Sequence, residues 1–485
     1  MTATLTSFSV YLVFLMSIGV YFYRKTASLE DYLIGGRAMG SWVAALSAQA
    51  SDMSGWLLMG LPGAVYLGGF SQAWIAIGLF IGTVLNWKYV AARLRVYTEK
   101  TDSMTLPSFF ESRFGDSSGM LRVFSAAVIL LFFTIYSASG LVASGKLFES
   151  LFNIDYNAAV MVGGIAIVLY TFLGGFMAVS WTDFFQGILM FFAITIVPAI
   201  AYGNIGGINS ITEAAFANGI SLSLMPEGIT ITAVISTAAW GLGYFGQPHI
   251  LARFMGIDHI KNVAPARKIA VIWVAISLAA AVLVGIIAVP MFPDIADSET
   301  VFIEMIAELF NPWFGGILLA AILSAIMSTI DSQLLVSSST LTEDFYNKII
   351  KRDASELEQM WVGRGFVIVI AVIAFILALN PNNTVLGLVA YAWAGLGAAF
   401  GPPVLFALFS KKTSWQSIFA GMLIGTLTLI IWKESGLGTH LYEIVPGFAA
   451  NVLVVMIVNN FIKQDDKKIL DTFDEFEETY QKDLS

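Results

Sequence analysis

The sequence predicts an all-α membrane protein with thirteen transmembrane helices, and three observations favour this fold class. Hydrophobic residues make up 57% of the 485 residues and charged residues only 12%, whereas soluble domains carry roughly 25% charged residues. Apolar windows of about 20 residues, long enough to cross a bilayer, recur along almost the whole chain. Two of these windows are interrupted by glycine, proline and polar residues, which is typical of helices that unwind around a bound solute.

The windows follow one another with connectors that carry most of the charge. In order, they are residues 6–23, 41–61, 69–92, 122–145, 157–178, 184–204, 229–252, 269–291, 313–342, 363–380, 385–409, 414–432 and 441–462. Residues 1–463 are therefore predicted to form one membrane domain. The acidic stretch 464–485 is predicted to be a cytoplasmic tail with a surface helix.

The basic residues predict the orientation. If the N-terminus lies outside, all but Lys146 and Lys433 of the 25 lysines and arginines fall in cytoplasmic loops or at adjoining helix ends. This distribution obeys the positive-inside rule, and an even number of spans would scramble it. We therefore expect a multi-pass plasma-membrane protein whose N-terminus is outside and whose C-terminus is cytoplasmic.

The second window carries a carboxylate in its middle, within Ser51–Gly55. A charge at membrane depth costs at least about 2.5–3.5 kcal/mol on insertion scales, so Asp52 is expected to face a cavity, an ion or a partner. Gly55 and the small hydroxyl residues favour unwinding of the helix here, which frees backbone carbonyls. Asp52 either binds an ion directly or holds the unwound backbone through hydrogen bonds, and a purely structural buried acid is the third alternative.

The seventh window contains the other interrupted segment, Trp240–Pro248. Interrupted segments at matching places in two halves of a chain indicate a transporter-type site. The spacing of five windows predicts an inverted repeat of spans 2–6 and 7–11, about residues 41–204 and 229–409, with broken helices 2 and 7. Windows 6–23, 414–432 and 441–462 are then peripheral.

The ninth window supplies oxygen atoms for a cation. A hard cation such as sodium takes oxygen ligands, and in a helix the Ala325 carbonyl lies one turn before the hydroxyls of Ser328 and Thr329. Freed carbonyls of Ala50 and Met53 would complete a five-oxygen site. The alternative is that the hydroxyls bond back to their own helix or to a neighbour.

Three further charged residues have more than one interpretation each. Asp183 and Asp331, with Ser328 and Ser332, form either an ion exit path or a second cation site; alternatively, Asp183 reaches water at the end of its span. Arg37, just before the second window, is either a topology anchor or a functional residue.

A solute site needs donors for an anionic group and an apolar wall. The amides of Ser54, Gly55 and Trp56 begin the second half-helix of the broken span and are placed to receive a carboxylate. Aromatic faces attract an ammonium group, and the candidate wall consists of Trp56, Tyr136, Trp240 and Tyr244. The alternative for each ring is a place in the interfacial aromatic belt.

Several function classes are disfavoured. The chain has no cysteine, which excludes disulfides and thiolate chemistry. Its histidines, His249, His259 and His440, form no metal-binding pattern, so we expect no enzyme. The net charge of −9 lies mostly in loops and the tail and says little about partners, and nucleic acid is disfavoured. An ion channel is disfavoured because a pair of inverted broken helices suits alternating access better than a continuous pore.

Four stretches carry a resemblance: Ser47–Ala64, Tyr170–Asp183, Trp240–Arg253 and Ala392–Pro402. They closely resemble the sodium:solute symporter family, and the likeness runs from the first span to the last. The resemblance implies the thirteen-span, five-plus-five inverted-repeat fold of the LeuT-type transporters. It also implies sodium-coupled symport of L-proline across a bacterial inner membrane, with sodium co-transported and no organic cofactor. Sodium- or proton-coupled uptake of another small amino acid or a betaine is the alternative.

The resemblance also assigns residues. It places sodium on the set proposed above, Ala50, Met53, Ala325, Ser328 and Thr329, and it implies that Asp52 is essential for coupled transport and that Arg37 acts in coupling. For proline it points to Ser54, Gly55, Trp56, Tyr136, Trp240, Tyr244 and Pro248. Some relatives carry a small residue at Asp331, so the number of ions does not transfer with the resemblance.

Overall fold

Helices make up nearly all the regular structure in the computed structural model, which describes residues 2–23, 28–173, 175–351, 353–380 and 382–484. The α-helices are α1 (Thr2–Tyr23), α2 (Leu29–Ile34), α3 (Ser41–Asp52), α4 (Leu61–Gly68), α5 (Ala73–Leu85), α6 (Ala91–Lys100), α7 (Leu106–Phe114), α8 (Met120–Phe152), α9 (Tyr156–Leu173), α10 (Phe176–Asn204), α11 (Ile208–Ala217), α12 (Ile231–Ala238), α13 (Pro248–Met255), α14 (Val263–Met291), α15 (Val301–Leu309), α16 (Pro312–Ser339), α17 (Glu356–Ala378), α18 (Val385–Phe409), α19 (Trp415–Glu434), α20 (Ile444–Phe461) and α21 (Lys467–Leu484). Three tighter or wider helical segments matter below: η2 (Trp56–Gly60), η5 (Ala239–Gly246) and η8 (Thr340–Ile350).

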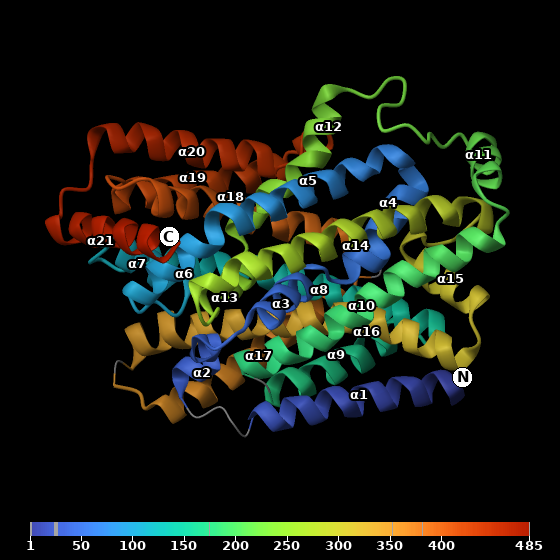
Figure 1. Cartoon of the computed structure of the whole chain (residues 1–485), viewed down its shortest axis with the longest axis horizontal. Helices are drawn as coiled ribbons and strands as arrows, with labels where there is room; N and C mark the ends of the chain where they lie inside the picture. The colour runs from blue at the N-terminus through green and yellow to red at the C-terminus, as the bar shows by residue number, and fades with distance from the viewer. Residues whose placement is uncertain (1, 24–27, 174, 352, 381, 485) are drawn as a thin grey trace.

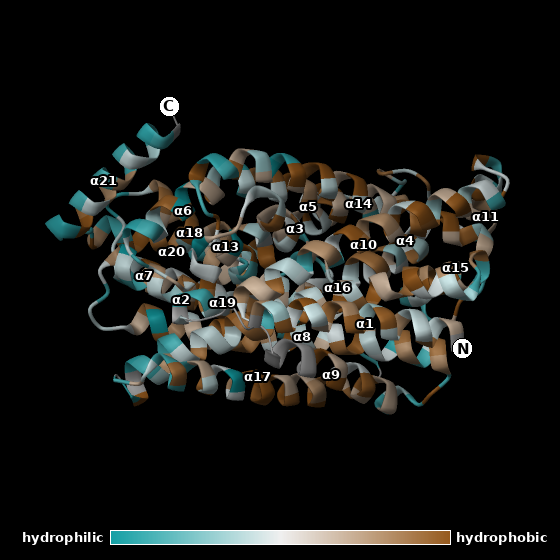
Figure 2. Ribbon diagram, turned by 60° about the horizontal axis from the view of Figure 1, so that its bottom comes forward, coloured by the Kyte–Doolittle hydropathy of each residue, from teal (hydrophilic) through white to brown (hydrophobic). Residues whose placement is uncertain are grey.

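The long helices are apolar enough to cross a membrane. Among the described residues, ten helical stretches of at least 18 residues meet that criterion. The other three predicted windows hold shorter apolar helices, Trp56–Gly68, Tyr156–Ile167 and Ile231–Gly246. Figure 2 shows hydrophobic residues along the long helices and hydrophilic residues concentrated in α21. The prediction of an all-helical, multi-pass membrane protein is therefore confirmed, and such helices satisfy their backbone hydrogen bonds internally, as a bilayer requires.

The helices form a bundle around the short central helix α3 (Figure 1). Helices α8, α9, α16 and α17 pack on one another, while α3 packs on α10, α13, α14 and α16. Helices α19 and α20 pack mainly on each other and on α18, and α1 packs on α10 and α16. The two termini lie at opposite ends of the bundle (Figure 1). Arg24, Lys25 and Arg352, which enter the orientation argument, and Gly174 of one quoted stretch lie outside the described residues.

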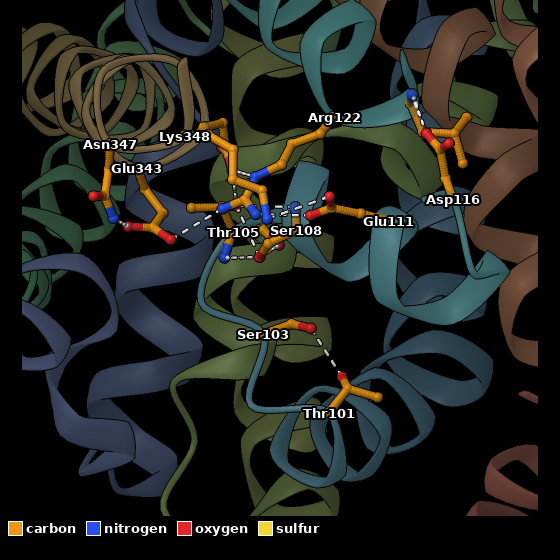
Figure 3. Close-up of polar contacts among 12 residues, drawn as sticks. Thr101, Ser103, Thr105, Ser108, Glu111, Asp116, Arg122, Glu343, Asn347 and Lys348 are labelled. Carbon is orange, nitrogen blue, oxygen red and sulfur yellow. Dashed lines mark hydrogen bonds and ion pairs between the residues drawn. The ribbon is translucent and has the colours of Figure 1, made fainter. Parts of the chain in front are cut away.

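The connector helix α7 is held by a cluster of ion pairs (Figure 3). Arg122, at the start of α8, bonds to Glu111 of α7 at 2.7 Å and to Glu343 of η8 at 3.0 Å. Lys348 of η8 lies 3.5 Å from the second oxygen of Glu111. Because Arg122 is 6% exposed, these pairs are better shielded from salt than surface pairs. Helix α7 is therefore tied to both α8 and η8.

The predicted tail helix, α21, packs on α6. Its Phe473 and Phe476 are buried against Tyr97, and its Glu477 pairs with Arg93 at 2.5 Å. One apolar face thus covers the end of α6 while the acidic face stays exposed, which is the pattern of an amphipathic surface helix.

Helix α5 and the segment η5 approach each other through glycines. A methyl group on Gly78 would lie 2.0 Å from the Ala238 carbonyl oxygen, and one on Gly82 would lie 2.3 Å from the Gly241 carbonyl oxygen. Small residues four positions apart allow such close backbone contact between membrane helices. The interrupted segment of the seventh window is therefore seated directly on α5.

We expect Gly78→Ala to destabilise the protein by about 1–3 kcal/mol, because the methyl group must push η5 away from α5. The measurement is thermal unfolding in detergent together with the amount of protein in the membrane. Gly203→Ala on α10 is the matched control, because no other atom lies within 4 Å of its added methyl group. Equal unfolding temperatures for the two variants would contradict the close contact.

Candidate ion and solute site

The second window breaks at Met53. Helix α3 ends at Asp52, and Met53 has φ −81° and ψ 71°, so its carbonyl turns away from the helical direction, for which ψ is near −42°. The freed carbonyl of Asp52 accepts hydrogen bonds from the Ser54 amide (2.9 Å), the Trp56 indole (3.0 Å) and the Tyr136 hydroxyl (3.3 Å). The chain continues as η2 and α4. The break is therefore built into the packing and is held by three donors.

The seventh window breaks between α12 and α13. Residues 239–246 form the 3₁₀ segment η5, and Gln247 is extended, with φ −86° and ψ 106°. Asn86 on the segment after α5 donates to the Tyr244 carbonyl at 3.0 Å, and the Gln247 side chain donates to the Gly243 carbonyl at 3.2 Å. Side chains thus satisfy these two carbonyls, and that of Tyr244 would have no partner in a regular α-helix because residue 248 is a proline without an N–H.

Four of the five predicted cation ligands meet between α3 and α16. The Ser328 hydroxyl donates to the Ala50 carbonyl at 2.7 Å and lies 3.3 Å from the Ala325 carbonyl. The Thr329 hydroxyl lies 3.1 Å from the Ala325 carbonyl and 3.4 Å from the Ala50 carbonyl. All four residues are buried. The hydroxyls bond both to their own helix and across to α3, so these oxygens converge. The Met53 carbonyl, three residues after Ala50, is turned out of the helix.

Asp52 connects the two breaks. One of its carboxylate oxygens, Oδ2, accepts a hydrogen bond of 2.5 Å from the Tyr244 hydroxyl on η5. The other, Oδ1, is buried and has no hydrogen-bond partner among the described residues. Leaving a buried carboxylate oxygen unpaired is energetically costly, so this oxygen is suited to bind a hydrogen-bond donor or a cation.

Trp56, Tyr136 and Tyr244 bond to Asp52, through its carbonyl or its carboxylate, and Trp240 contacts the Trp56 ring. Trp56, Tyr136, Trp240 and Tyr244 are all buried, and the ring centroids of Trp56 and Trp240 are 6.4 Å apart. These rings are in the protein interior, not in an interfacial belt. Pro248 lines a small cavity with Met255 and Thr340.

The backbone amides that were predicted to receive a carboxylate are partly engaged. The Ser54 amide donates to the Asp52 carbonyl at 2.9 Å, and the Trp56 amide lies 3.4 Å from the Ser54 hydroxyl. At Gly55, an added methyl group would lie 2.9 Å from the Ala143 methyl group on α8. Gly55 therefore allows the break to press against α8.

Asp183 lies in a second buried polar cluster. Its Oδ2 atom accepts from Ser47 (2.7 Å), from Ser51 (3.0 Å) and from the guanidinium of Arg253 (3.1 Å). Ser332 on α16 bonds to Ser51 at 2.9 Å and to Arg253 at 2.5 Å. Asp183 and Arg253 are both fully buried, so Asp183 does not reach water. Asp331, the neighbour of Ser332, is also buried.

Arg37 lies apart from the four converging oxygens. Its guanidinium donates to the Met255 carbonyl (2.9 Å), the Thr98 carbonyl (3.0 Å) and the Ser103 carbonyl (3.1 Å). These acceptors are the end of α13, the end of α6 and the connector to α7. Arg37 therefore ties together the ends of two helices and a loop.

Comparison with known proteins identifies the family. The family model described as the Sodium:solute symporter family matches residues 32–425. The chain belongs to the sodium:solute symporter family. It is 51% identical over 466 residues to the Sodium/proline symporter of Escherichia coli and 50% identical over 465 residues to that of Salmonella typhimurium, in each case 94% of this chain and 92% of the relative. It is 46% identical to the High-affinity proline transporter PutP of Bacillus subtilis, over 96% of this chain and 99% of the relative.

The fold has a solved counterpart. The structure of a Na+-coupled sialic acid symporter superposes with a TM-score of 0.80 at 20% identity, covering 95% of this chain and 98% of that chain. At this identity the likeness shows the fold alone. Membership of the symporter family and this fold agree with the all-helical membrane protein predicted from the sequence.

In this member of the sodium:solute symporter family, four residues at the site had no role in the sequence prediction. Arg253 pairs with Asp183, and Asn86 holds the Tyr244 carbonyl. Trp393 donates to the Trp240 carbonyl at 2.7 Å, and the Tyr442 ring stacks on the Trp240 ring at 5.5 Å. An arginine within a quoted stretch was a signal for Arg253. Trp393 also lies within a quoted stretch, Ala392–Pro402, whereas Asn86 and Tyr442 stand in ordinary apolar or loop sequence and gave no signal.

Proposed function

We propose that this chain is a sodium-coupled symporter that carries L-proline into the cell by alternating access. The names of relatives that are 50% and 51% identical over 94% of the chain support the substrate. The observation that carries the proposal is the contact of Ser328 with the Ala50 carbonyl, because it brings oxygens of α16 against the break in α3. A solute site at that break is then coupled to the binding of an ion that joins α3 and α16.

Sodium is the ion that fits this contact. The hydroxyls of Ser328 and Thr329 now donate to carbonyls; when they rotate, their lone pairs face the same point as the Ala50 and Ala325 carbonyls. A hard monovalent cation takes such neutral oxygens. We assign sodium to Ala50, Met53, Ala325, Ser328 and Thr329. The bound ion fastens α16 to the break and shapes the adjoining pocket.

Proline is proposed to bind beside Asp52. Aromatic faces attract its secondary ammonium group, and backbone amides at the start of a half-helix attract its carboxylate. The proposed pocket residues are Ser54, Gly55, Trp56, Tyr136, Trp240, Tyr244 and Pro248. Asp52 couples the two sites, because its carboxylate holds Tyr244 of the pocket while belonging to the helix that carries Ala50. Arg37, Asp183 and Asp331 are proposed to act in ion coupling on the cytoplasmic route.

The proposed membrane arrangement is the finer one predicted from the sequence. All thirteen windows span the bacterial inner membrane, the N-terminus is outside and the C-terminus is cytoplasmic. Residues 1–463 form the transporter domain, with inverted repeats at about 41–204 and 229–409, and 464–485 form the cytoplasmic tail. Sodium is co-transported, no organic cofactor is needed, and no covalent step takes place, so the protein is not an enzyme.

The driving force is sufficient for accumulation. A tenfold sodium gradient supplies about 1.4 kcal/mol, and a membrane potential of about 100 mV supplies about 2.3 kcal/mol per charge. At one sodium ion per proline, the sum supports an accumulation of a few hundredfold.

The test is uptake of labelled L-proline into proteoliposomes that contain the purified full chain. With an inward sodium gradient, we expect accumulation above the external concentration, and with potassium in place of sodium we expect none. Uptake that stops at the external concentration under a sodium gradient would indicate a channel and contradict the proposal. Inhibition of labelled L-proline uptake by an unlabelled betaine or by other small amino acids identifies the alternative substrates.

A further inference from the structure

Trp393 on α18 lies against the broken segment η5. Its indole nitrogen donates a 2.7 Å hydrogen bond to the Trp240 carbonyl, and the side chain is 1% exposed. A methyl group on Gly243 would lie 1.9 Å from that nitrogen, so only glycine admits the indole at this place. The stretch Ala392–Pro402 stood out in the sequence, and the proposed transport mechanism gives it no role.

The same tryptophan contacts η5 and its flank at two more points. The Tyr244 ring meets the Trp393 ring edge-on, with centroids 5.0 Å apart and an interplanar angle of 87°. The Trp393 carbonyl accepts a 3.1 Å hydrogen bond from the Gln247 side chain, which also donates to the Gly243 carbonyl. Trp393 of α18 thus contacts Trp240 near the start of η5, Tyr244 within it, and Gln247 just after its end.

This contact matters because η5 has little rigidity of its own. A 3₁₀ segment has poorer hydrogen-bond geometry than an α-helix, so groups outside it fix its shape. Trp240 and Tyr244 project from η5 toward Asp52 and Trp56. If Trp393 lost its N–H, the buried Trp240 carbonyl would lose this hydrogen bond, and the segment would be less firmly held in its present position.

We propose that Trp393 is a positioning residue that sets the width of the imino-acid pocket through Trp240 and Tyr244, and so selects proline over homologues with a smaller or larger ring. The inference rests on the proposed function, because it concerns the specificity of that same pocket. Trp393 itself need not touch the solute. Its indole N–H fixes the backbone at Trp240, and its ring supports the ring of Tyr244.

The test compares Trp393→Phe with Trp432→Phe. The first keeps an aromatic ring and removes the N–H. The second removes an indole N–H that also donates to a backbone carbonyl, that of Leu441 at 2.9 Å, but on α19. Uptake of L-proline, and its competition by the four-membered homologue azetidine-2-carboxylate and the six-membered homologue pipecolate, are measured in proteoliposomes with equal amounts of protein.

For Trp393→Phe we expect the KM for proline to rise about tenfold, the effect of one lost hydrogen bond, with the maximal rate per protein nearly unchanged. We also expect the preference for proline over pipecolate to fall by about the same factor. Trp432→Phe is expected to keep both wild-type values. A uniform fall in uptake of all three solutes, or wild-type KM and preference in Trp393→Phe, would overturn the inference.

A second readout does not depend on the solute. Hydrogen exchange of residues 239–247 in the purified protein is expected to be faster in Trp393→Phe than in wild type or in Trp432→Phe. Unchanged exchange would also overturn the positioning role. If Trp393→Phe does not fold, Trp393→benzothienylalanine keeps the shape and replaces only the N–H by sulfur. Failure of the wild-type protein to accumulate proline would contradict the proposed function, while the exchange measurement would still decide whether Trp393 holds η5.

Discussion

The double variant Ser328→Ala/Thr329→Ala is expected to raise the sodium concentration for half-maximal L-proline uptake about a hundredfold. Each hydroxyl lies within 3.4 Å of the Ala50 carbonyl and of the Ala325 carbonyl. Each substitution therefore removes one neutral ligand from the proposed ion. A hydrogen bond to a charged group contributes about 1.5–3 kcal/mol. Losing two such contacts weakens sodium binding by more than the remaining carbonyls can restore. The measurement is initial uptake as a function of sodium at fixed proline.

The matched control is Thr134→Ala/Thr195→Ala. These hydroxyls also lie in membrane helices, but they bond to carbonyls of their own helices, those of Leu130 (2.6 Å) and Phe191 (2.7 Å). We expect the control to keep the wild-type sodium dependence. If the Ser328/Thr329 variant had the same sodium curve as the control, the five-oxygen site would be wrong, even if both variants transported more slowly.

Asp52→Asn is expected to reduce sodium-driven proline uptake at least about a hundredfold while leaving the amount of folded protein nearly unchanged. The amide oxygen still accepts from the Tyr244 hydroxyl, whose present bond to Asp52 is 2.5 Å, so the link between the two breaks survives. The negative charge is lost, however, and a charge near a cation contributes a few kcal/mol at an effective dielectric constant of about 20. Uptake and sodium activation are measured together, with the protein quantified in the membrane.

Asp116→Asn provides the comparison for this charge. Asp116 is 3% exposed and accepts from the Leu121 amide at 2.7 Å in the turn between α7 and α8, so the same substitution is made at a buried acid outside the proposed site. We expect its uptake to stay within about threefold of wild type, since losing a capping contact affects stability more than binding. Retention of uptake in Asp52→Asn would show that the carboxylate charge has no part in coupling.

Local periodicity accounts for what could be predicted at the candidate site. Ala325, Ser328 and Thr329 are three and four positions apart, so any helix places their oxygens on one face. The break at Met53 follows from a carboxylate, small hydroxyl residues and a glycine within five residues. That the two faces meet is a tertiary fact: the oxygen atoms of the residues suggested it as a hypothesis, and the resemblance to a symporter family implied the same five residues.

The rotation of each helix could not be predicted in the same way. Most of these helices are apolar all round, so no polar face tells which side is turned inward. The pairing of Asp183 with Arg253, the contact of Trp393 with Trp240, and the stacking of Tyr442 on Trp240 join residues 70, 153 and 202 positions apart along the chain. Each depends on how two helices pack.

The sequence by itself determined that the chain crosses the membrane many times, where two of its helices break, and which backbone and hydroxyl oxygens could serve a cation. These properties depend on composition and on spacing within a single helix, and both are visible in the order of residues. Only the tertiary structure decided that Arg253 meets Asp183, that Arg37 ties helix ends and not the oxygen cluster, and that Trp393 holds the broken segment. The reason is that interlocking side chains from distant parts of the chain fix the rotation and depth of an evenly apolar helix.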